Sequence, residues 1–205
     1  SLVGTGINDR VELTFTPTAG SLISTVSGSV TNSQLVTGGY LGSYIPNSTT
    51  GLITRLEDTA NKTGLTSYIN SKKGVLFLHA KCIDESSNQF MGLYTSSLDG
   101  ISIFGNTSGV WTANMQIAGV NYYSGVDGIS KTNMTKIAIV WNDVTFDIYA
   151  NGVKTSTRVV SSAFAENDLT SFGFSFVNNF HGNIKESRVY MSDITEAEAI
   201  TLTTL

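Results

Sequence analysis

Apolar and polar positions alternate along most of this chain. Near the N-terminus, Val11, Leu13 and Phe15 are separated by single polar residues. Side chains two positions apart lie on the same face of a strand, so this period predicts a half-buried β-strand. Residues 21–26 and 33–36 predict further short strands, separated by Gly and Asn.

The pattern is stronger from residue 74 onward. Residues 74–83 are apolar on both faces, which is typical of a strand in the middle of a sandwich. Asn151-Gly152 lies between two β-rich arms within residues 144–157, and an Asn-Gly pair favours the type I′ turn of a tight hairpin. Further strands are predicted at residues 90–95, 100–104, 111–125, 136–141, 171–177 and 184–191.

Only the C-terminal tail has a helical signature. Thr195 and Glu198 have the spacing of a capping box, in which each side chain accepts a hydrogen bond from the other residue's backbone N–H. Ala199, Ile200 and Leu202 continue a helix of about two or three turns, which must pack on the sheets to be stable.

A long Gly/Ser/Thr-rich connection over residues 38–51 predicts a module boundary near residue 50. Residues 1–50 are then a small N-terminal β segment, either the end of an upstream β-sandwich or an oligomerisation region. Residues 51–205 form a β-sandwich, in which residues 57–71 are polar and weakly patterned and predict an extended surface connection. The fold class is therefore predicted to be all-β.

Charge and cysteine content exclude several classes of function. Charged residues make up 14% of the chain, and the net charge is −4. Without a basic run, nucleic-acid binding and polybasic membrane docking are disfavoured. The longest apolar stretch, residues 74–78, is too short to span a bilayer, so no membrane insertion is expected. The single cysteine, Cys82, lies within a strand pattern, which favours a buried, inert thiol.

The order of motifs after residue 74 resembles a known family. Residues 135–141, followed by the Asn-Gly hairpin, then residues 169–176 and 182–198, resemble the strands, hairpin and closing helix of concanavalin A-like (laminin-G-like) domains. The resemblance covers residues 74–205. It implies a jelly-roll β-sandwich with a short C-terminal helix.

Residues 42–58 carry a second resemblance. Their Ser-Tyr-Ile-Pro and Thr-Arg segments resemble a stretch common in bacteriophage tail and fibre proteins, although this chain differs from it at Asn47, Leu56 and Glu57. The resemblance implies a virion appendage protein, displayed on the virion surface or otherwise extracellular, that binds host-surface glycan. It also implies a homotrimer, for which this sequence shows no heptad repeat.

Aromatic and amide side chains are the chemistry that binds sugars, because a ring stacks on a sugar while amides bond its hydroxyl groups. The richest stretch is residues 111–123, where Thr112, Asn114 and Gln116 share one strand face and Trp111 lies on the other. The polar face is the better candidate, and core packing competes as the role of each aromatic. The candidate ligand-binding residues are Trp111, Asn114, Gln116, Tyr122, Tyr123 and the loop residue His181.

Catalytic and metal-binding patterns are weak. The Glu-x-Asp-x-x-Glu strand of β-glucanases is absent, and Asp84-Glu85 would point to opposite faces of a strand, so no enzyme activity is expected. His79 and His181 lack metal-ligand spacing, and His79 is predicted to be structural. Three aspartates could ligate Ca²⁺, although solvated turn residues are the favoured interpretation, and no cofactor is assigned. They are Asp99, Asp127 and Asp143.

The sequence thus predicts a non-enzymatic virion appendage protein that binds host-surface carbohydrate. Two alternatives remain. The sandwich could be a structural decoration or assembly module that contacts other virion proteins, or it could belong to a bacterial surface adhesin.

Overall fold

The computed structural model describes residues 60–83, 89–95, 99–174 and 180–205, together with a few isolated positions before residue 60. The chain divides into two units, Ser1–Glu57 and Asp58–Leu205. The predicted N-terminal β segment and its boundary near residue 50 lie outside the described residues and stay predictions.

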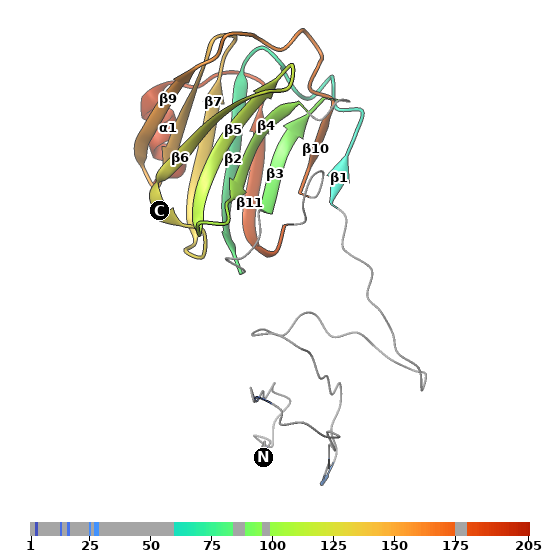
Figure 1. Cartoon of the computed structure of the whole chain (residues 1–205), viewed down its shortest axis with the longest axis vertical. Coiled ribbons are helices and arrows are strands. Elements are labelled where there is room, and N and C mark those ends of the chain that lie inside the picture. The colour runs from blue at the N-terminus through green and yellow to red at the C-terminus, as the bar shows by residue number, and fades with distance from the viewer. Residues whose placement is uncertain are drawn as a thin grey trace. The chain divides into compact units, whose positions relative to one another are not determined.

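The C-terminal unit consists of two antiparallel sheets, shown as stacked layers in Figure 1. The six-stranded sheet has the order β1 (Asn61–Lys62), β10 (Ser171–Gly173), β3 (Gln89–Tyr94), β4 (Gly100–Gly105), β5 (Val110–Ile117) and β6 (Val120–Ser130). The five-stranded sheet has the order β11 (Gly182–Tyr190), β2 (Gly74–Cys82), β7 (Thr135–Trp141), β8 (Thr145–Ala150) and β9 (Val153–Val159). The predicted all-β sandwich is confirmed.

The main core lies between the two sheets. Alternate residues of each strand point inward, so Leu76 of one sheet and Ile103 of the other belong to the same buried cluster. Trp111 and Trp141 are its largest members, and both are almost completely buried. Cys82 is buried in this cluster, as predicted.

A second cluster lies on the outer face of the five-stranded sheet, where the helix α1 (Glu196–Thr203) packs. Its members are Val75, Phe77, Ala138, Tyr149 and Ala199. The predicted capping box is present, with the Thr195 hydroxyl accepting from the Glu198 N–H at 3.3 Å. Among the described residues, no helix has the length and apolarity needed to cross a membrane.

Two tight hairpins determine how strands pair. Asn151 and Gly152 join β8 to β9 with φ values of 48° and 82°, so the predicted type I′ hairpin is confirmed. The prediction of one strand over residues 111–125 is wrong. The chain turns at Ala118 and Gly119, with φ values of 50° and 77°, and forms the two paired strands β5 and β6.

The β5–β6 turn has no Asn-Gly signal, because its first residue is an alanine in a conformation that alanine rarely adopts. It is held instead by a distant contact, since the Asp99 Oδ1 atom accepts a hydrogen bond from the Gly119 N–H at 3.0 Å. The turn folds the polar residues of β6 back onto those of β5.

Candidate functional site

The outer face of the six-stranded sheet gathers polar and aromatic side chains from adjacent strands. Asn114 of β5 lies opposite Ser102 of β4 and Tyr123 of β6. Residues directly opposite in an antiparallel pair share a face, so the strand register places these side chains together. We call this surface the polar face. It comprises Tyr94, Ser102, Phe104, Thr112, Asn114, Gln116, Asn121 and Tyr123.

Asn114 lies at the centre of the polar face. Its Nδ2 donates a hydrogen bond to the Oδ1 atom of Asn121 at 2.9 Å. The residue is only 6% exposed, and its Oδ1 atom has no hydrogen-bond partner in the described part of the chain. Buried acceptors are normally satisfied, so an orphaned one needs a partner such as an ordered water or a ligand hydroxyl.

Tyr123 supplies the exposed ring of this surface. It is 53% exposed, and its ring contacts the edge of Phe104, with centroids 6.1 Å apart. Phe104 itself is buried, so it supports the Tyr123 ring and leaves one side of it open to solvent. An anchored, exposed tyrosine can stack on a sugar at little cost in conformational entropy.

The Tyr94 side chain packs close to Gly92 of its own strand, β3, and to Gly100 of β4. A Cβ atom at Gly92 or Gly100 would come within about 3 Å of the Tyr94 ring, so these two glycines make room for it. Burial raises the pKa of the Tyr94 phenol, which therefore stays neutral.

Two candidate residues lie away from the polar face. Trp111 is fully buried between the sheets because it alternates with Thr112 along β5, so its prediction as a ligand-binding residue is wrong. Tyr122 lies opposite Met115 on the inner face and packs against the core, and its hydroxyl hydrogen-bonds to that of Ser161. The strand register therefore assigns the outward position to Tyr123 and not to Tyr122.

The remaining candidates are dispersed. His181 is exposed beside β11, in the other sheet, and its backbone carbonyl accepts from the Ile83 N–H at 2.9 Å. Asp99 caps the β5–β6 turn, whereas Asp143 forms an ion pair with Lys72 at 3.4 Å. Asp127 falls in β6, and its side chain lies outside the described residues. No group of three or more His, Cys, Asp or Glu side chains gathers as a metal site within residues 60–83, 89–95, 99–174 and 180–205, Asp127 aside.

His79 lies within β2, opposite Lys136 and Glu186 on the neighbouring strands. Burial and the nearby cations Lys185 and Lys136 lower its pKa, so the imidazole is neutral at pH 7. This placement within the five-stranded sheet agrees with the predicted structural role.

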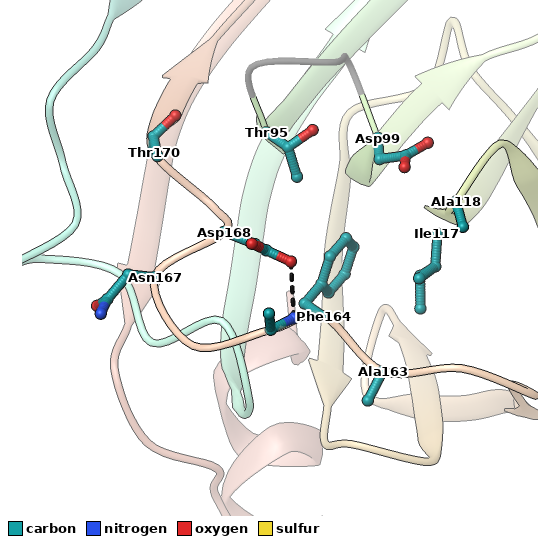
Figure 2. A pocket seen from close by; sticks show the side chains of 10 residues that line it. Thr95, Asp99, Ile117, Ala118, Ala163, Phe164, Asn167, Asp168 and Thr170 are labelled. Atoms are coloured by element: carbon teal, nitrogen blue, oxygen red, sulfur yellow. Dashed lines mark hydrogen bonds between the residues drawn. The ribbon is translucent and has the colours of Figure 1, made fainter.

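A pocket of about 430 Å³ opens at one end of the sandwich (Figure 2). Two of its lining residues directly follow residues of the polar face in sequence, Ile117 after Gln116 and Thr95 after Tyr94, while Ile117 and Phe164 themselves belong to the core between the sheets. The Phe164 ring occupies the middle of the lining, and the Asp168 carboxylate accepts from the Ala165 N–H at 2.6 Å. Sequence reasoning missed this pocket because four separate segments line it.

Solved structures that share this fold include carbohydrate-binding domains of bacterial enzymes. The CBM40 module of the Ruminococcus gnavus IT-sialidase, bound to α2,3-sialyllactose, matches with a TM-score of 0.55 and 14% identity, covering 73% of this chain and 97% of the module. Domain 4 of the Geobacillus stearothermophilus arabinanase AbnA, in complex with arabinotriose, matches with a TM-score of 0.53 and 15% identity, covering 68% of this chain and 69% of that domain.

The NanB sialidase of Streptococcus pneumoniae matches at 18% identity and a TM-score of 0.54, over 71% of this chain but only 26% of the sialidase. No family model matches the chain, and no curated protein matches it significantly. Residues 60–205 therefore have the lectin-like jelly-roll β-sandwich fold that these carbohydrate-binding modules share.

Proposed function

We propose that the chain binds carbohydrate through the polar face. The observation that carries this proposal is the orphaned Oδ1 atom of Asn114 beside the exposed ring of Tyr123. A sugar ring stacked on Tyr123 would bring a hydroxyl group within reach of Asn114, which would satisfy the buried acceptor. Asn121 and Gln116 flank this position and offer further amide groups.

The structural neighbours support the proposal. Two of them were solved with a bound sugar, sialyllactose in one and arabinotriose in the other. In this chain, α1 packs on the five-stranded sheet, and Tyr123 and Asn121 of the six-stranded sheet are exposed. The part of the polar face around Tyr123 and Asn121 is therefore the part open to a ligand.

A glycan array tests the proposal. The intact chain is applied beside two variants, Tyr123→Ala and the matched control Tyr68→Ala, which removes another exposed tyrosine, outside the polar face. We expect the wild-type chain and Tyr68→Ala to bind the same glycans and Tyr123→Ala to lose them. An array on which the wild-type chain binds nothing would reject carbohydrate binding, whereas equal binding by all three proteins would reject this face.

The proposal also extends to the biological setting of the chain. The resemblance of residues 42–58 to phage fibre sequences supports a non-enzymatic virion appendage that attaches to host-surface glycan. Adsorption of the chain to bacterial cells, with no released sugar in the supernatant, would agree with it. Binding to other virion proteins and to no cell would favour the assembly-module alternative, and binding to host tissue glycans alone would favour a bacterial adhesin.

A further inference from the structure

In the described strands, most cationic residues belong to the five-stranded sheet, and Lys131, which directly follows β6, is fully buried. No Lys or Arg occurs in residues 82–130 or 159–184, which supply β3, β4, β5, β6 and β10 of the six-stranded sheet. The two-residue edge strand β1 contributes Lys62, which lies opposite Phe172, a residue that packs against the core. The strands of the five-stranded sheet carry Lys81, Lys136, Lys154, Arg158, Lys185 and Arg188.

The pocket beside the polar face has the opposite charge. Asp99 and Asp168 both line it, and each accepts a hydrogen bond from a backbone N–H of a neighbouring turn. Within the described residues, neither carboxylate forms an ion pair. Lys72 lies next to Ser71, which contacts the Leu169 backbone, but the Lys72 ammonium pairs with Asp143.

This distribution decides which sugars the surface can accept. The carboxylate of a sialic or uronic acid, once partly desolvated, needs a cation or several hydrogen-bond donors to offset the lost hydration. On the polar face it would meet amide and hydroxyl groups, and in the pocket it would meet two carboxylates, where like charges at short range repel. Specificity of this kind arises from a repulsive element as much as from attractive contacts.

We therefore infer that the polar face and its adjoining pocket select uncharged glycans and reject acidic ones. The inference rests on the proposed carbohydrate binding and adds the class of ligand. It separates this chain from the structural neighbours that were solved with sialyllactose, because sharing their fold does not supply a cation here.

The test is an array in which each neutral glycan is paired with its sialylated or uronic-acid-bearing counterpart, at low ionic strength, where charge repulsion is least screened. We expect the neutral member of each bound pair to bind at least about tenfold more strongly than its acidic counterpart. The variant Asp99→Asn/Asp168→Asn keeps an oxygen for each backbone hydrogen bond and removes both charges. In this variant the ratio of neutral to acidic affinity should fall.

The outcomes distinguish a failure of the charge preference from a failure of the proposed carbohydrate binding. Preference for acidic glycans would overturn the inference and leave carbohydrate binding intact. Equal binding of both members, unchanged in Asp99→Asn/Asp168→Asn, would also overturn it. If no glycan of either class bound, the proposed function would fail and the inference with it. The control Asp143→Asn removes a carboxylate that already has a lysine partner, so it should leave the preference unchanged.

Discussion

Asn114 donates a hydrogen bond to Asn121 across the β5–β6 hairpin, with 2.9 Å between Nδ2 and Oδ1. The bond fixes the Asn114 amide in a buried position while its own Oδ1 atom stays without a partner. A protein gains no stability from such an acceptor, since its desolvation is not offset. The arrangement is what a preorganised ligand contact requires.

Replacing Asn114 should therefore separate stability from binding. Asn114→Leu removes both the orphaned acceptor and the hydrogen bond to the exposed Asn121, so the two effects offset and the free energy of unfolding should change by less than about 1 kcal/mol. Glycan affinity should fall by at least about tenfold, since each lost hydrogen bond to a ligand costs roughly that much. Urea denaturation and calorimetric titration measure the two quantities, and a destabilised variant with unchanged affinity would contradict this role.

The reciprocal variant, Asn121→Ala, should have the opposite effect on stability. It leaves the Asn114 Nδ2 group buried without its acceptor, which costs about 1–2 kcal/mol in the free energy of unfolding. Urea denaturation measures this cost. The variant Asn142→Ala, which removes an exposed asparagine of the β7–β8 turn, gives the cost of losing a turn amide at the surface for comparison. Equal stability of Asn121→Ala and the wild-type chain would show that the hydrogen bond is not formed.

The β5–β6 turn offers a stabilising substitution. Ala118 has a φ of 50°, a left-handed conformation that asparagine tolerates better than alanine. Ala118→Asn restores the Asn-Gly pair of a type I′ turn and should raise the free energy of unfolding by roughly 0.5–1 kcal/mol. Thermal unfolding detects it as a higher Tm. A lower Tm would indicate that residues 118 and 119 do not form this turn.

The capping box makes stability depend on pH. Hydrogen bonds from the backbone N–H and the hydroxyl of Thr195 lower the pKa of Glu198 below its usual 4.5. The carboxyl group of Glu198 is thus a stronger acid in the folded chain than in the unfolded chain. Its stabilising effect is present above pH 4.5 and is lost as the pH falls through the lower, folded-state pKa.

The variant Glu198→Gln should lose this dependence. Denaturation curves of both proteins between pH 7 and pH 3 would converge on the acidic side, with the wild-type chain more stable at neutral pH. A constant difference across the range would contradict the link to Glu198. Glu196→Gln serves as a control for a first-turn carboxylate that makes no capping hydrogen bond and pairs with Lys154 at 3.5 Å.

Local signals made most of the fold predictable. The Asn151-Gly152 turn and the Thr195 capping box each depend on residues close in sequence, and the apolar run of β2 identifies a central strand by itself. The turn at Ala118 depends on a hydrogen bond from Gly119 to Asp99, twenty residues away, so no short sequence pattern could predict it.

The site was only partly predictable for the same reason. Strand alternation already placed Thr112, Asn114 and Gln116 on a separate face from Trp111. The choice between Tyr122 and Tyr123 needed the register of β6, which the missed hairpin sets. The pocket could not be predicted, because its lining is assembled from segments that meet only in the folded sandwich.

The most direct test of carbohydrate binding at the polar face is an NMR titration of the ¹⁵N-labelled chain with the neutral glycan that binds most strongly on the array. We predict saturable shifts of the Asn114 and Asn121 side-chain amides and of the backbone amides of Thr112 and Tyr123. The amide of His181, in the other layer, should not shift. Shifts confined to the five-stranded sheet, or none at saturating glycan, would contradict the account.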